Sequence, residues 1–121
     1  MEKGYKQSRK NDSTEYESSN IEELRGLYIN STSEALPQLA SENNWVIKFD
    51  HCFQRVVLDN VFGDVWYNQL EKSDSKPAYK QLSRNQLVSA LNLCREMEKK
   101  GGEKVEELKK KSLRFRGKLS E

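Results

Sequence analysis

Residues 50–67 hold most of the side chains in this chain that could do chemistry. The segment, DHCFQRVVLDNVFGDVWY, contains the single histidine, His51, one of the two cysteines, Cys52, and one of the two tryptophans. At a helical period its apolar residues point in nearly every direction, whereas a surface helix keeps them in one stripe. We therefore expect a central helix over residues 50–71 that is capped by Asp50, packed on several sides, and holds polar groups inside the protein.

Arg55 and Asp59 form the most suggestive charged pair of this segment. They are four residues apart, so on a helix they lie within reach of each other. A buried charge without a partner is costly, so each of them, if buried, would need the other. The spacing predicts a structural ion pair, a small polar pocket walled by Trp66 and Phe62 that receives a ligand or partner side chain, or exposure at the surface.

His51 and Cys52 raise the question of metal or nucleophile chemistry. Structural zinc usually takes four protein ligands and catalytic zinc three plus water, but the chain has one His and two Cys, none in CxxC or HxxxH spacing. A Cys–His nucleophile pair needs its side chains aimed at each other, whereas neighbours on a helix point about 100° apart. Phosphate-binding glycine motifs and GxSxG are missing too. We expect no catalytic residue, no metal and no cofactor.

The clearest helical signal outside the central segment covers residues 83–100. Ser83 is the cap, Gln86 closes a capping box at the third position, and Gly101 ends the helix. Apolar residues at helical spacing predict its inward face, namely Leu87, Ala90, Leu91, Cys94 and Met97. Because Cys94 lies on this face, we expect its thiol to act as a small buried hydrophobic group.

Two more helices are predicted, one at each end of the folded part. The first covers residues 20–29 and is capped by Ser19 or Asn20, with Gly26 making it marginal on its own. The last covers residues 103–116. Its inward side is predicted to carry Val105, Leu108 and Phe115.

The connecting segments are predicted to be irregular. Pro37 disfavours a helix over residues 30–44. Residues 45–49 are rich in β-formers but lack a partner strand, so we expect an extended lead-in, and residues 72–82 form a loop. Gly63 lies inside the predicted central helix, where we expect it to let another element approach closely. The fold class is therefore all-α, a small bundle of three to four helices.

Residues 1–19 are predicted to be a disordered tail, and residues 20–121 a single helical domain. The first twenty residues contain no Leu, Ile, Val, Phe or Trp, so they cannot bury enough apolar surface to offset the entropy of ordering. No secretory segment and no membrane-spanning run is present in the sequence. We expect a cytoplasmic protein in which Cys52 and Cys94 are free thiols.

The C-terminal end of the chain is basic. Residues 99–121 hold nine Lys or Arg against four Glu, a net charge of +5, which leaves −3 for the first 98 residues of a chain with net charge +2. The predicted last helix begins with acidic residues and ends with basic ones. The helix dipole favours this order, so the charge pattern can be explained without a binding partner. The alternatives are a surface for nucleic acid or for an acidic protein. The nucleic-acid contacts would be Lys109, Lys110, Lys111, Arg114 and Arg116.

The central segment also carries a resemblance. The runs FDHCFQRVVLDNVFGDVWY, KPAYKQL and SLRFRGK, within residues 45–117, are similar to short uncharacterised bacterial proteins, notably cyanobacterial ones. Some members of that group are labelled acetyltransferases, which implies a cofactor of the coenzyme A type. The residues themselves predict neither the mixed sheet nor the glycine-rich turn that the usual acetyltransferase fold needs.

Three functions remain open from the sequence. The first is a non-enzymatic helical binding module, an adaptor for another protein, whose tail and first helix become ordered on contact. Its contact surface would include Arg55, Asp59, Trp66 and Tyr79. The second is a nucleic-acid-binding protein that uses the basic last helix and loses affinity steeply with salt. The third is an acetyltransferase-like enzyme. The oligomeric state is left open.

Overall fold

The protein is described here by a computed structural model of residue 16 and residues 18–117. Every regular element among these residues is helical, apart from one isolated bridge between Ser73 and Lys76, which confirms the predicted all-α bundle. Most of the predicted tail lies outside the described residues. None of the described helices is long and apolar enough to cross a membrane.

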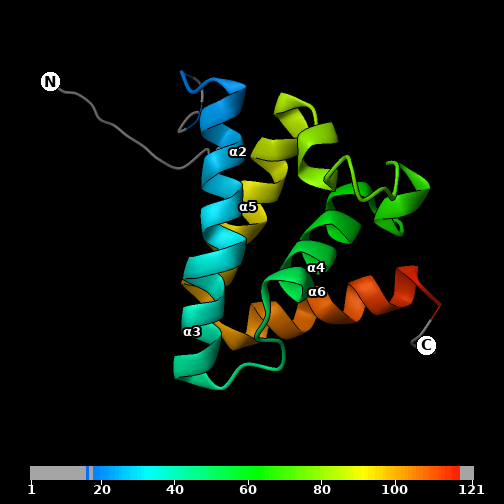
Figure 1. Ribbon diagram of the computed structural model, residues 1–121. Helices are drawn as coiled ribbons and strands as arrows, with labels where there is room; N and C mark the ends of the chain where they lie inside the picture. The colour runs from blue at the N-terminus through cyan, green and yellow to red at the C-terminus, as the bar shows by residue number, and fades with distance from the viewer. Residues whose placement is uncertain (1–15, 17, 118–121) are drawn as a thin grey trace, which may run out of the picture.

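A helical rod runs through the segment for which a loop was predicted. The helix α2 (Ile21–Asn30) continues through a π-helix, η1 (Ser31–Ala35), into α3 (Leu36–Asn43), seen from blue to cyan in Figure 1. Pro37 does not interrupt it, because Pro37 lies in the first turn of α3, directly after the π-helical change of register, where its missing N–H is tolerated. The loop prediction was therefore wrong.

The central helix exists but is shorter than predicted. The helix α4 (Asp50–Phe62) has Phe49 at its N-cap position, so Asp50 is its first residue and does not cap it. It ends at Gly63, whose φ of 64° is the left-handed conformation typical of a helix C-cap. No atom lies within 4 Å of the position that a Gly63 Cβ would take. The predicted close approach was thus wrong, and the glycine serves to end the helix.

The two C-terminal helices confirm the prediction. They are α5 (Arg84–Lys100) and α6 (Gly102–Phe115), and Gly101 separates them. Ser83 and Gln86 exchange both hydrogen bonds of the predicted capping box. Between α4 and α5 lie two short 3-10 helices, η2 (Trp66–Asn68) and η3 (Ala78–Gln81).

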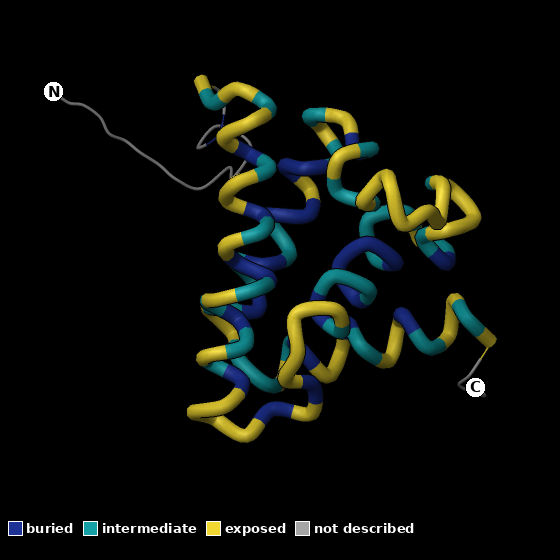
Figure 2. Tube along the Cα trace, in the orientation of Figure 1, coloured by how far each residue is buried: buried dark blue, intermediate teal, exposed yellow. Residues whose placement is uncertain are grey.

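The helices enclose one core, with α5 packed against α2, α4 and α6, and α4 packed against α6. The buried stretches face each other across the middle of the molecule in Figure 2. All five residues predicted for the inward face of α5 are buried, as are Val105 and Leu108 of α6. Phe115, the last residue of α6, is 36% exposed instead of facing inward.

The folded part also begins earlier than predicted. Tyr16 is only 2% exposed and belongs to the core. Arg84 donates from its guanidinium to the backbone carbonyls of Tyr16 and Ser19, which fastens this segment to the start of α5. Asn20 then caps α2 in a capping box with Glu23.

Candidate functional site

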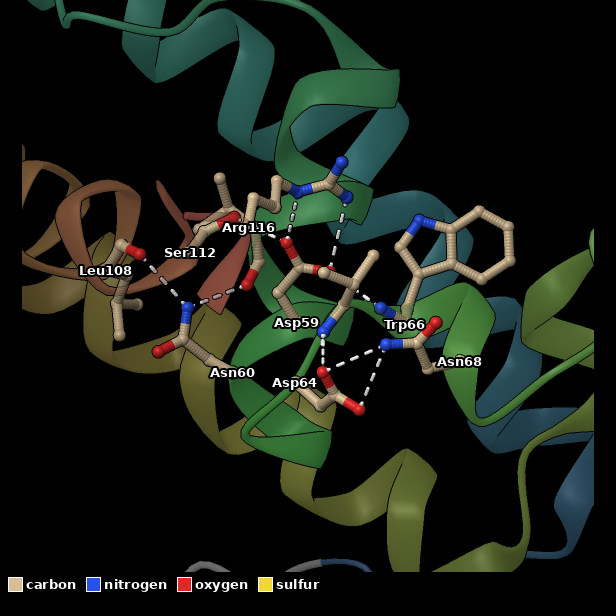
Figure 3. A network of polar contacts seen from close by, with 10 residues as sticks. Asp59, Asn60, Asp64, Trp66, Asn68, Leu108, Ser112 and Arg116 are labelled. Carbon is tan, nitrogen blue, oxygen red and sulfur yellow. Dashed lines mark hydrogen bonds and ion pairs between the residues drawn. The ribbon is translucent and has the colours of Figure 1, made fainter. Parts of the chain in front are cut away.

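Asp59 is the centre of the polar network shown in Figure 3. Its carboxylate is fully buried. Oδ2 accepts hydrogen bonds from Ser112 Oγ at 2.6 Å and from Arg116 Nε at 2.7 Å. Oδ1 accepts from the backbone N–H of Trp66 at 3.0 Å and from Arg116 Nη2 at 3.3 Å. Four hydrogen bonds therefore satisfy the carboxylate, donated by Ser112 of α6, by Arg116 at the C-cap of α6 and by the backbone of η2.

The predicted pairing of Arg55 with Asp59 was wrong. Both residues lie on α4 at the expected spacing, but the partner of Asp59 is Arg116, 57 residues further along the chain. Spacing within one helix reports only neighbours on that helix, and here the carboxylate faces the end of α6. The half-buried Arg55 makes no ion pair or hydrogen bond with the residues that the structure describes.

Arg116 is consequently not part of a free basic surface. Its side chain is 16% exposed, it is ion-paired with Asp59, and its guanidinium lies 5.6 Å from the centre of the Tyr67 ring. Lys111 pairs with Glu107 at 3.4 Å. Of the remaining predicted nucleic-acid contacts, Lys110 and Arg114 are exposed and Lys109 is half-buried.

Two members of this network were not predicted, Asn60 and Ser112. Asn60 donates from Nδ2 to the backbone carbonyl of Leu108 at 3.0 Å and so adds a second tie between α4 and α6. Ser112 is 2% exposed. It follows Val105 and Leu108 at helical spacing, so a polar residue on an apolar stripe was the signal that could have revealed it.

A pocket of about 330 Å³ lies between α2, α4, η2 and η3. Its lining, which is mostly apolar, consists of Tyr28, Ile29, His51, Gln54, Arg55, Leu58, Trp66, Pro77, Ala78 and Tyr79. Three of the four residues predicted to contact a partner, Arg55, Trp66 and Tyr79, are thus brought to one cavity. Asp59 is not among its lining residues, and neither is Phe62, which was predicted as a wall.

Aromatic rings form much of the pocket wall. The ring centres of Tyr28 and Tyr79 are 6.4 Å apart. Tyr28 is 1% exposed, and its hydroxyl finds no hydrogen-bond partner within the described part of the chain. Burial raises the pKa of this hydroxyl well above its ordinary value, with a smaller contribution from Cys94. Trp66 reaches the pocket from η2, and its own backbone N–H donates a hydrogen bond to Asp59.

Among the described residues, no hydrogen bond joins the histidine to either thiol. Cys52 and Cys94 are both free thiols, and burial raises the pKa of Cys94 to about 12. His51 is exposed and stacks on Phe49, with ring centres 6.0 Å apart and an interplanar angle of 4°. No three His, Cys, Asp or Glu side chains of the described residues come together as metal ligands.

Comparison of the chain with protein-family models, curated proteins and solved structures gives no match.

Proposed function

We propose that this protein is a non-enzymatic binding module that holds a segment of another protein in the pocket between α2 and α4. The observation that carries the proposal is the combination of a mostly apolar, aromatic-walled cavity with the guanidinium of Arg55, which has no partner within the described structure. Protein interfaces gain most of their energy where a large apolar side chain fills such a pocket and arginine or aromatic residues surround it.

The surface next to the pocket supports the same function. Phe49 is 64% exposed and stacks on His51, which lines the pocket. Exposed apolar side chains that continue from a pocket extend the area that a partner can bury. The described lining contains no carboxylate, thiol or serine, so it presents binding groups rather than a nucleophile beside a base.

The hydrogen bonds behind Trp66 support a pocket that is formed before a partner binds. Trp66 is held through its backbone by the buried Asp59, which Arg116 and Ser112 fix in turn. A preformed site loses less conformational entropy on binding than a mobile one. We therefore propose an architectural role for the Asp59 network and a contact role for Arg55, Trp66 and Tyr79.

The other sequence-based alternatives remain predictions. Nucleic-acid binding would now depend on Lys109, Lys110, Lys111 and Arg114, since Arg116 is engaged with Asp59. The acetyl transfer implied by the resemblance to bacterial proteins is one of these predictions, and a cytoplasmic location is part of the proposal.

Selection from a library of short random peptides displayed on phage tests the proposed function. We expect the wild-type protein to enrich peptides that the pocket-filling variant Ala78→Trp does not retain. The matched control is Ser89→Trp, an exposed position on α5 that is not part of the pocket lining, and it should retain them. Circular dichroism verifies that both variants are folded, and Trp66→Ala, which removes a wall, serves as the second pocket variant. Failure of the wild type to enrich peptides, or equal retention by all variants, would contradict the proposal.

A further inference from the structure

A second hollow of about 370 Å³ adjoins the pocket along α2. It is lined by Glu22, Arg25, Gly26, Ile29, Tyr79 and Lys80. Ile29 and Tyr79 line both hollows, so they form the wall that the two share. The lining of the first hollow is mostly apolar, whereas the lining of the second includes several charged side chains.

Gly26 leaves the backbone of α2 open in the second hollow. It lies in the middle of the helix, where only proline is less favourable. A Cβ added at this position would meet no atom within 4 Å. Packing within the described chain therefore does not require a glycine here, whereas a ligand that runs close to the helix backbone would.

The charges around the two hollows are mainly positive. Arg25, Arg55 and Lys80 contribute three cationic groups, and Glu22 is the one acidic side chain in the described linings. Glu22 already accepts a hydrogen bond from Arg25 Nη1 at 2.9 Å. The Nε of Arg25 is buried and has no hydrogen-bond partner among the described residues, so one donor of this guanidinium remains unsatisfied. Guanidinium groups bind carboxylates with favourable geometry.

Resting on the proposed function, we infer that the two hollows form one groove for an acidic peptide segment. The segment places a large apolar side chain in the pocket and a carboxylate on Arg55. It then passes Tyr79 close to the backbone of Gly26 and places a second acidic residue beside Lys80. Charge complementarity selects this partner, since a basic segment would meet Arg55 and Lys80, neither of which is paired with a carboxylate of the described residues, whereas Arg25 is already paired with Glu22.

The composition of the selected peptides tests this inference. We expect peptides retained by the wild type to contain an excess of Asp and Glu beside an apolar residue, and the double variant Arg55→Glu, Lys80→Glu to shift the selection towards Lys and Arg. If Ala78→Trp loses the selected peptides but these peptides show no excess of Asp and Glu, the acidic groove is overturned and the proposed binding module stands. An acidic excess that persists in the double variant would also overturn it. If the wild type retains no peptide, the proposed function itself fails.

Gly26→Gln tests the second hollow separately. Glutamine favours a helix, so thermal unfolding should show no loss of stability, while its side chain fills the hollow. We expect the affinity for the retained acidic peptides to fall about tenfold or more, as for the loss of an interface anchor, and Ser89→Gln to leave it unchanged. Equal affinities for the wild type and Gly26→Gln would overturn the groove. Titration with labelled oligo(dT) tests the competing partner, and tight binding that Arg55→Glu abolishes would overturn the peptide assignment in favour of nucleic acid.

Discussion

Arg116 Nε lies 2.7 Å from Asp59 Oδ2, which ties the end of α6 to a fully buried carboxylate on α4. Ser112 and the backbone of Trp66 complete the coordination of the same carboxylate. One acidic residue therefore fixes the position of α6 and of η2, and through Trp66 it positions a wall of the pocket.

Removing either partner of this ion pair should destabilise the protein. Asp59→Ala or Arg116→Met leaves the other group without its counterion, and breaking a buried pair costs about 3–5 kcal/mol of unfolding free energy. Arg55→Gln, on the same helix as Asp59, should change that energy by less than about 0.5 kcal/mol, as at other positions without partners. Urea unfolding measures all three variants. A cost for Arg55→Gln equal to that of Arg116→Met would show that the network is assigned wrongly.

Two glycines should respond to alanine with opposite signs. A Cβ meets no atom within 4 Å at Gly63 or at Gly26, so backbone conformation alone decides the outcome. Gly63 has a φ of 64°, and an alanine there costs about 1–2 kcal/mol. Gly26 is helical, and an alanine there should add about 0.5–1 kcal/mol. Thermal unfolding of both alanine variants measures the two effects. Unfolding temperatures that shift in the same direction in both variants would refute the prediction.

The capping box of α5 should contribute measurably to stability. Ser83 accepts from the backbone N–H of Gln86 at 3.1 Å, and replacing such a cap by alanine costs about 1 kcal/mol. Ser89→Ala, in the exposed middle of the same helix, is the control and should be neutral or slightly stabilising. Chemical unfolding measures the free energy of unfolding of both variants, and the prediction fails if Ser83→Ala is as stable as Ser89→Ala.

Stability should fall at alkaline pH. The pKa of Cys94 is raised from 9.0 to about 12 in the folded protein. Above pH 9 the unfolded chain therefore loses this proton before the folded one does, and the free energy of unfolding falls with rising pH, by at most about 1.4 kcal/mol per pH unit for one group. Tyr28, whose pKa is also raised, acts in the same direction above pH 10. Cys94→Ala should have a shallower slope in urea unfolding between pH 9 and 11, and an unchanged slope would contradict the assignment.

Local signals in the sequence predicted much of the fold. The capping box at Ser83 and the apolar spacing along α5 depend on residues within a few turns of one another, so both could be predicted without knowing the tertiary structure. Pro37 misled the prediction because its cost depends on its place within the helix, and the π-helix before it changes that place.

The site was predictable only in part, for a related reason. Arg55, Trp66 and Tyr79 were candidates by residue type, but the turn at Gly63 and the path of η2 and η3 bring them to one cavity. The pair of Asp59 and Arg116 joins helices far apart in sequence, and spacing within α4 pointed to Arg55 instead. The second hollow gave no signal in the sequence beyond an unexplained helical glycine, Gly26.

A charge exchange between Arg55 and the bound peptide tests the central claim most directly. Isothermal titration calorimetry would measure the tightest retained acidic peptide against the wild type and Arg55→Glu, and then the same peptide with its essential acidic residue replaced by lysine. We expect Arg55→Glu to lose about tenfold or more in affinity, as for a close interfacial charge pair, and the lysine peptide to restore most of it. Equal binding of the acidic peptide to the wild type and Arg55→Glu would contradict the claim that this guanidinium receives the partner.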